Sequence, residues 1–153
     1  MYIKNMWMLC CTLISCGDIV EYCTEMGCID GLQMTLEPPI TTHASYIFTV
    51  TLDGETITCE YALPFVEEGG EYGSCDGEGV WLTISGTALD ASQHSIPEIY
   101  IPSNPSEVLI EITKDEEVLV RETVAPEYEE FAPNGKDCGP ICYSAGATIS
   151  ISE

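Results

Sequence analysis

Basic residues are scarce in this chain of 153 residues, which contains four lysines and arginines against 26 aspartates and glutamates. So acidic a chain repels phosphate backbones, and we therefore expect no binding to nucleic acid. It also repels anionic lipid head groups, so attachment to a membrane cannot come from a basic patch. Histidine is nearly absent too, with two residues, and no G-x-S-x-G nucleophile motif occurs in the chain.

Long hydrophobic runs are also missing. The uncharged apolar stretch over residues 6–14 is too short for a transmembrane helix, which needs roughly 20 residues. No segment shows a convincing helical periodicity. The chain is nevertheless 45% hydrophobic, which is too apolar for a disordered protein, so we expect it to fold.

The N-terminus has the features of an export signal. Lys4 precedes the apolar run, and the small residue Ser15 follows it. Leu13-Ile14-Ser15-Cys16 resembles the lipobox of bacterial lipoproteins, in which the cysteine thiol is acylated and the cysteine becomes the first residue of the mature protein. The resemblance implies that residues 1–15 are a signal peptide that is removed and that Cys16 carries the lipid. A plain secretory signal and a structural segment are the alternatives.

The residues after Cys16 indicate the cellular localisation and form a short tether. Gly17 stands where an aspartate would alter sorting, so the motif resembles that of outer-membrane cargo and implies a lipid-anchored protein of the bacterial envelope. Residues 16–22 form the lipidated cysteine and a short tether, whose six residues after Cys16 reach at most about 20 Å. Residues 23–153 form one domain. After Cys16, three cations face all 26 acidic residues, a net charge of −23.

Cysteine usage agrees with an exported protein. Of nine cysteines, Cys10 and Cys11 lie in the signal and Cys16 carries the lipid. An even set remains, which is typical of a disulfide framework in an oxidising compartment: Cys23, Cys28, Cys59, Cys75, Cys138 and Cys142. A zinc site built from the first two and last two of these is the alternative, although their spacings differ from the usual finger pattern.

A period of two runs through the chain and predicts β-strands. Asp53-Gly54 separates two alternating runs, 46–52 and 55–61, and predicts a hairpin with a type I′ turn. In the register that this turn sets, Phe48 opposes Cys59, and Cys59 points into the core. A second hairpin is expected from 108–113 and 118–123 around a four-residue turn. Further strands are expected at the following segments: 31–36, 80–85, 147–152 and an edge strand at 98–101.

The disulfide pairing follows from this register and from the expected strand order. Cys59 is expected to pair with Cys75, because the segment between them leaves the core after Cys59 and returns to the same core at Cys75. First and last strands of many sandwiches lie side by side and parallel, which would bring the two terminal cysteine clusters together. We therefore rank Cys28–Cys142 with Cys23–Cys138 first, since long loops give the larger entropic stabilisation. The local pairs within each cluster rank second, and the crossed alternative, Cys23–Cys142 with Cys28–Cys138, ranks third.

Seven or eight antiparallel strands in one domain predict a β-sandwich of immunoglobulin-like architecture, with a small antiparallel barrel as runner-up. The immunoglobulin Cys…Trp…Cys order is missing, because Trp81 follows Cys75. Residues 133–135 and 138–142 also resemble segments of uncharacterised bacterial surface lipoproteins. Neither likeness implies an activity.

Candidate sites for chemistry are few. Asp76 and Glu78, with the acidic residues 67–71, are weak calcium candidates, because carboxylates on a glycine-rich backbone suit that ion. Asp90, His94 and Ser95 hold the letters of a catalytic triad, but we interpret them as surface-loop residues. We expect no cofactor and no enzyme activity.

Three long loops, 63–79, 87–106 and 124–143, carry aromatic residues: Phe65, Tyr72, Tyr100, Tyr128 and Phe131. They either form a recognition patch for a basic protein or a carbohydrate, or cover the open ends of the sandwich, which we favour. The chain is thus interpreted as an envelope-anchored lipoprotein with a binding or structural role. The alternative is an accessory or catalytic domain of an extracytoplasmic enzyme. The sequence leaves the oligomeric state open.

Overall fold

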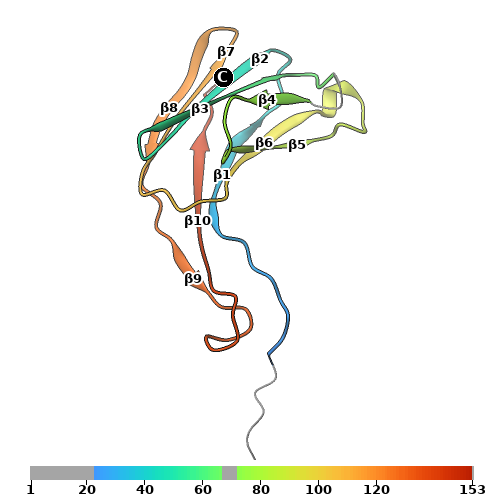
Figure 1. The fold of residues 1–153 in the computed structure, drawn as a ribbon. Helices are drawn as coiled ribbons and strands as arrows, with labels where there is room; N and C mark the ends of the chain where they lie inside the picture. Colours follow the sequence, from blue (N-terminus) through green and yellow to red (C-terminus); the bar gives the residue numbers. More distant parts are fainter. Residues whose placement is uncertain (1–22, 67–71, 153) are drawn as a thin grey trace, which may run out of the picture.

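A computed structural model of the chain describes residues 23–66 and 72–152. In these residues ten strands form two five-stranded sheets that pack face to face without closing into a barrel (Figure 1), which confirms the β-sandwich. A single turn of 3-10 helix spans Ala91–Gln93. The strands are β1 Gly31–Ile40, β2 Ser45–Leu52, β3 Glu55–Ala62, β4 Gly73–Cys75, β5 Trp81–Ser85, β6 Ser95–Ile101, β7 Val108–Lys114, β8 Glu117–Val124, β9 Glu129–Phe131 and β10 Cys142–Ser150.

The two sheets have the orders β5-β6-β1-β10-β9 and β4-β3-β2-β7-β8. Every neighbouring pair is antiparallel except β1 and β10, which are parallel, with Leu32 beside Ala145 and Leu36 beside Ile149. The first and last long strands therefore lie side by side, as expected from the sequence. The three-residue strands β4 and β9 lie inside segments that the sequence analysis treats as loops.

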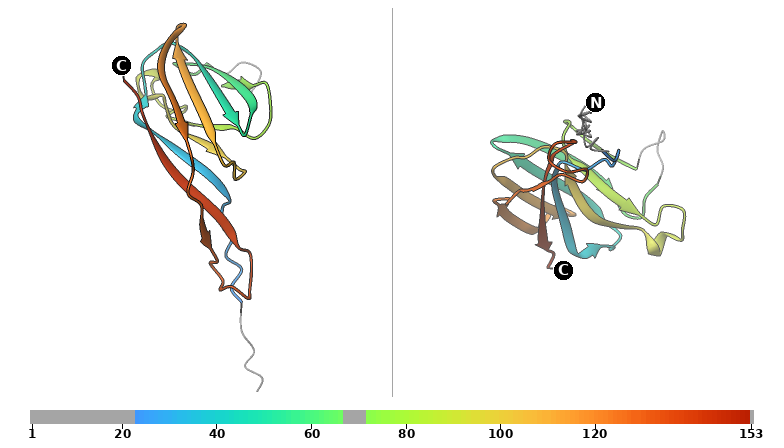
Figure 2. Two further views of the ribbon diagram at one scale, coloured as in Figure 1. Left: turned by 90° about the vertical axis from the view of Figure 1, so that its left-hand side faces the viewer. Right: turned by 90° about the horizontal axis from the view of Figure 1, so that it is seen from below.

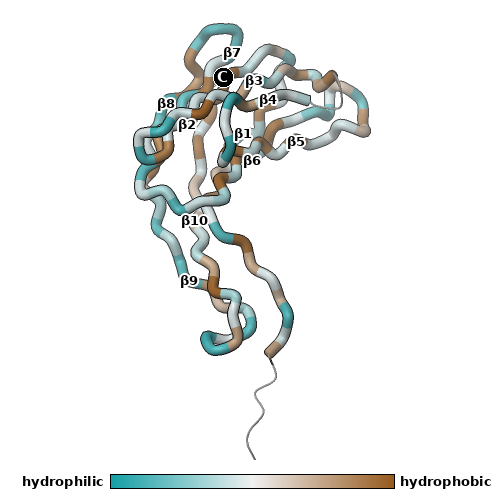
Figure 3. Tube along the Cα trace, in the orientation of Figure 1, coloured by the Kyte–Doolittle hydropathy of each residue, from teal (hydrophilic) through white to brown (hydrophobic). Residues whose placement is uncertain are grey.

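Alternation along the strands builds the core. The inward positions of β1, β2 and β7 are almost fully buried, whereas their outward neighbours are exposed in β1, exposed or half-buried in β2 and half-buried in β7. Hydrophobic and hydrophilic residues are interspersed along the chain (Figure 3). The largest fully buried side chains come from both sheets and include Met34 and Ile99 from one and Phe48 and Ile110 from the other. Burial of such side chains between two sheets is the main favourable contribution to folding.

The β2–β3 hairpin has the predicted register. Leu52 pairs with Glu55 across the turn, and Phe48 pairs with Cys59. Asp53 and Gly54 both have positive φ, 47° and 98°, as a type I′ turn requires.

The β7–β8 hairpin differs from its prediction in the length of the turn. Only Asp115 and Glu116 form it, with φ of 47° and 73°, in place of the four expected residues. The register then shifts, so that Thr113 pairs with Val118 but Ile112 pairs with Val120. Val118 thus pairs with Thr113, which alternates with the buried positions of β7, and its side chain is 53% exposed.

Strand β6 is an inner strand between β5 and β1, so the edge-strand prediction for residues 98–101 is wrong. Proline in an inner strand lacks a ladder donor and is tolerated at bulges. Pro97 lies where the register of β6 shifts against both neighbours, between Ile96 and Glu98 on the β1 side. Two irregularities at one position thus accommodate Pro97 inside the sheet.

A narrow stem projects from the sandwich (Figures 1 and 2) and consists of residues 23–30 and 129–143. Cys23 pairs with Cys138, and Cys28 pairs with Cys142, at Cα–Cα distances of 5.3 and 6.0 Å. These are the pairs that the sequence analysis ranks first. Asn134 adds hydrogen bonds to the backbone N–H and carbonyl of Met26.

Gly31 joins the stem to the sandwich. Its φ is +113°, and a Cβ at this position would overlap the Ile101 carbonyl oxygen, so only glycine fits here without strain. The N-terminal side of the described chain thus enters through the stem, whereas the C-terminus lies at the far end of the sandwich (Figure 1). Residues 1–22, which include the expected signal, Cys16 and the tether, lie outside the described residues. Within the described part, no helix is long and apolar enough to cross a membrane.

Candidate functional site

The outward face of the sheet that contains β5, β6, β1 and β10 carries an aromatic pair. Trp81 on β5 and Tyr100 on β6 are direct cross-strand partners with ring centroids 5.6 Å apart. Trp81 is 60% exposed. The row continues from Tyr100 to Gln33 on β1 and from there to Gly146 on β10. Directly paired residues point to the same face of a sheet, so these four positions form one row across four strands.

A second row runs parallel to the first and contains Thr83, Glu98, Thr35 and Thr148. The Glu98 carboxylate accepts hydrogen bonds from the Gln33 side-chain amide and from the Thr83 hydroxyl, the latter at 3.3 Å. These two donors fix the position of the carboxylate. An ionised carboxylate has about four acceptor sites, so it can accept further hydrogen bonds from a ligand. We call the two rows together the Trp81 face.

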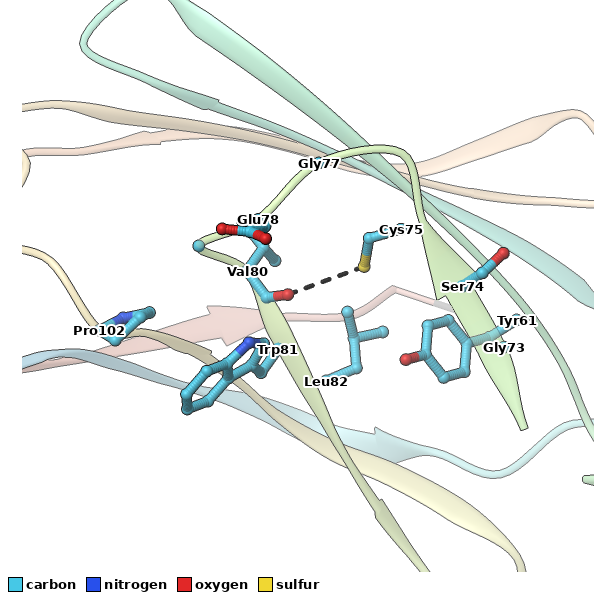
Figure 4. Close-up of a pocket in the computed structure, with 11 residues that line it drawn as sticks. Tyr61, Gly73, Ser74, Cys75, Gly77, Glu78, Val80, Trp81, Leu82 and Pro102 are labelled. Carbon is cyan, nitrogen blue, oxygen red and sulfur yellow. Dashed lines mark hydrogen bonds between the residues drawn. The ribbon is translucent and has the colours of Figure 1, made fainter. Parts of the chain in front are cut away.

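The Trp81 face borders an open pocket of about 790 Å³ that lies between the edge strands β4 and β5. Figure 4 shows Trp81 and Pro102 toward one end of the pocket and Cys75 and Tyr61 toward the other, with Glu78 at its rim. Because Trp81 belongs both to the pocket and to the aromatic row, the two form one continuous surface.

Cations are missing from the strands of this sheet. Strands β1, β5, β6, β9 and β10 contain no lysine or arginine. In the described residues, Arg121 on the opposite sheet lies 3.5 Å from Glu111, and Lys136 in the stem lies 3.6 Å from Glu130. The Trp81 face therefore presents aromatic rings, hydroxyl groups, one amide and a carboxylate. Such a surface can stack on a flat or cationic group and accept its hydrogen bonds.

Comparison with protein-family models, curated proteins and solved structures finds no match for this chain. The function must therefore be argued from the geometry of the chain itself.

In the described residues, the weak calcium candidates Asp76 and Glu78 do not belong to a cluster of metal-ligating side chains. The Asp76 carboxylate accepts a hydrogen bond from the Thr58 backbone N–H at 2.7 Å, and Glu78 lines the pocket. Residues 67–71, the other part of that hypothesis, lie outside the described residues. Over residues 23–66 and 72–152, no three or more His, Cys, Asp or Glu side chains come close enough together to hold a metal ion.

His94 is buried, with 6% of its surface exposed, so its interpretation as a surface-loop residue is wrong. Its Nδ1 accepts the Phe65 backbone N–H at 3.0 Å, and its Nε2 donates to the Leu89 carbonyl at 3.3 Å. The ring also stacks on the Phe65 ring, with centroids 5.4 Å apart. Because both nitrogens have backbone partners, the ring has none left for Ser95, and its role is to hold two loops together.

The aromatic candidates of the long loops divide into three groups. Phe65 is buried, and Tyr72 and Tyr128 pack against the core, which agrees with the interpretation that they cover the sandwich. Phe131 is 56% exposed in the stem, and Tyr100 belongs to the Trp81 face. Burial, with a smaller contribution from the negative charge of Asp53, raises the pKa of Tyr128, whose hydroxyl donates to the Pro105 carbonyl.

Sequence reasoning predicts a strand over residues 80–85 but does not assign Trp81 to a site, and it does not single out Gln33 or Glu98. One signal was available: Trp81 is the single tryptophan after Cys16 and occupies an outward position of an alternating strand. Tryptophan is enriched at protein interfaces, so an outward tryptophan on a strand marks a candidate contact surface.

Proposed function

We propose that this protein is a lipid-anchored binding protein of the bacterial envelope, attached through Cys16, that presents the Trp81 face to a partner. The pairing of the cysteines carries the proposal. All six cysteines after Cys16 form three disulfides, the third being Cys59–Cys75 with a Cα–Cα distance of 3.9 Å. Such a framework persists in oxidising compartments and is rare in the cytosol. The one other cysteine of the proposed exported chain is Cys16, which is the residue that the lipobox resemblance assigns to the lipid.

The position of the stem supports the same proposal. Chain that leaves an anchor on Cys16 spans at most about 20 Å before Cys23, where the first disulfide ties it into the stem. Two disulfides, Cys23–Cys138 and Cys28–Cys142, then join the two chain segments of the stem. A braced stem after a short tether would hold the sandwich, and with it the Trp81 face, away from the bilayer surface. The net charge of −23 after Cys16 favours the same separation from anionic lipid.

Replacement of the acylated cysteine tests the anchor. Cys16→Ala is expected to abolish incorporation of a palmitate analogue and to move the protein from the detergent-rich to the aqueous phase on Triton X-114 partitioning. Two or more acyl chains give stable membrane attachment, and their removal leaves no other strong membrane affinity. Cys11→Ala is the matched control, because it removes a thiol from the segment that is expected to be cleaved.

The control variant should label and partition like the unmodified protein. Cys16→Ala protein that still carries lipid, or that partitions unchanged, would overturn the proposed anchor. Mass spectrometry of the purified chain gives an independent readout, since the proposed mature protein lacks residues 1–15 and carries the mass of the lipid on Cys16.

A further inference from the structure

The geometry points to a lysine- or arginine-rich segment of a partner protein as the ligand of the Trp81 face. This inference names the partner of the binding role proposed above and rests on that role. It does not depend on the lipid, because the face lies wholly within the described sandwich.

Charge complementarity is the first argument. The chain after Cys16 carries 26 acidic residues and three cations, so its field attracts cations and speeds their association. The strands of the sheet that carries the Trp81 face contain no lysine or arginine. Glu98 lies on this face, and Glu78 lies beside it in the adjoining pocket. A basic segment thus meets no repelling charge on these strands.

The aromatic pair is the second argument. Lysine and arginine are attracted to the face of tryptophan more strongly than to other rings, within about 6 Å of the ring centroid. Trp81 exposes 60% of its surface on the sheet, and Tyr100 beside it is held by a hydrogen bond from its hydroxyl to the Asp30 carbonyl at 2.6 Å. Ordered rings lose little entropy on binding, which favours affinity.

The fixed carboxylate is the third argument. Gln33 and Thr83 donate to different oxygens of Glu98, which holds the carboxylate on the row next to the rings. A guanidinium or ammonium group that stacks on Trp81 can therefore donate to a carboxylate that is already positioned. Hydrogen bonds between charged partners are about twice as strong as neutral ones.

The length of the row is the fourth argument, and it favours a peptide over a small cation. Trp81, Tyr100, Gln33 and Gly146 lie on four adjacent strands, and three strand spacings of about 4.8 Å span roughly 14 Å. An extended segment of about four residues covers that distance. Nothing lies within 4 Å of where a Cβ of Gly146 would be, so the row is unobstructed at its β10 end.

Fluorescence of Trp81 tests the inference directly. The chain has two tryptophans, Trp7 and Trp81, so the full chain with Trp7→Phe reports on the face alone, whether or not the N-terminal segment is retained. The purified protein in detergent is titrated with an eight-residue peptide of alternating lysine and arginine, with spermine and with cellohexaose. We expect a saturable change with the peptide, weakened by added salt because the contacts are ionic, a much weaker response to spermine, and none to cellohexaose.

Two charge-neutralising variants separate a local site from the overall field. Glu98→Gln removes the carboxylate of the face, and Glu122→Gln removes one from an exposed position of β8 on the other sheet. We expect Glu98→Gln to weaken peptide binding about tenfold and Glu122→Gln to weaken it by less than about twofold. Tyr100→Ala should also weaken it severalfold, and circular dichroism checks that each variant is folded.

The inference is overturned by any of four results: no saturable response to the peptide at low salt, equal losses in the Glu98 and Glu122 variants, spermine binding as tight as peptide binding, or a salt-independent response to cellohexaose. The last would identify a carbohydrate as the ligand. Each of these results leaves the anchor on Cys16 untouched, whereas failure to lipidate Cys16 leaves the titration unaffected, so the two proposals fail separately.

Discussion

Aspartate side chains close the ends of strands in this fold through the same reciprocal contact. The backbone N–H of Asp53 donates to the Glu107 carbonyl, and the Asp53 carboxylate accepts the Glu107 N–H. Asp76 makes the same pair of bonds with Thr58, and Asp115 makes it with Ser45. Part of the acidic content thus satisfies backbone donors of segments 18 to 70 residues away in the sequence.

The hydrogen bonds of Asp53 make the stability of the folded protein depend on pH. Hydrogen bonds from the Ser106 side chain and from the backbone of Glu107 and Ser106 hold its pKa below the usual range. A lowered pKa in the folded state stabilises the protein above the pKa of the unfolded state, about 3.9, and this stabilisation is lost as the pH falls through the folded value. We therefore expect Asp53→Asn to lower the Tm at pH 7 and to have little effect on it at pH 2.5.

Thermal unfolding between pH 7 and pH 2.5 measures this effect. Glu55→Gln is the matched control, because it removes a carboxylate from the same hairpin at an exposed position. If both variants show the same dependence on pH, overall charge and not the hydrogen-bonded carboxylate of Asp53 is responsible.

At the scale of elements, the two hairpins form the same kind of two-residue turn with different residues. The β2–β3 turn uses Asp53-Gly54, and the β7–β8 turn uses Asp115-Glu116 with both residues at positive φ. The left-handed conformation is costly for a residue with a Cβ but not for glycine. The second hairpin therefore carries a strain that the first avoids.

Glu116→Gly is expected to stabilise the protein by about 0.5 kcal/mol. Relief of the left-handed residue contributes about 1 kcal/mol, and the greater backbone entropy of glycine in the unfolded chain offsets part of it. Glu117→Gly, one residue later in β8, should destabilise by about 0.5–1 kcal/mol, because glycine weakens a strand. Urea denaturation at constant m-value compares the two, and a loss of stability in Glu116→Gly would contradict the strain argument.

At the scale of the whole molecule, two disulfides close nearly the same large loop. Their sequence separations are 115 and 114 residues, whereas Cys59–Cys75 closes one of 16. Once either long bridge exists, the other closes only the short path through residues 23–28 and 138–142. Their contributions to stability are therefore coupled.

Replacing one bridge with a serine pair, Cys23→Ser with Cys138→Ser, should cost about 3 kcal/mol, since a loop of roughly ten residues remains to be closed. Replacing Cys28 and Cys142 should cost a similar amount. Loss of both bridges should cost about 7 kcal/mol, more than the sum of the separate losses, because only then does the long loop open. Urea denaturation of the three variants measures the coupling, and strictly additive losses would contradict it.

Local chemistry determined a large part of this fold from the sequence. The period of two predicts strands, the Asp53-Gly54 turn sets the register that places Cys59 opposite Phe48, and the same register directs Cys59 toward Cys75. These features depend on residues close together in the chain. The terminal disulfides needed one further assumption, the parallel pairing of first and last strands, which β1 and β10 fulfil.

The order of the strands, by contrast, was decided only by tertiary structure. Residues 98–101 are predicted as an edge strand, but register shifts at Pro97 against both neighbours let β6 lie inside its sheet. His94, in a polar loop, is buried because a distant loop packs over it. The Trp81 face depends on the same order, since Gln33, Trp81, Tyr100 and Gly146 are far apart in the sequence. Periodicity states which way each side chain points, but only the packing of the whole core determines which strands are neighbours, and so which outward residues form a common surface.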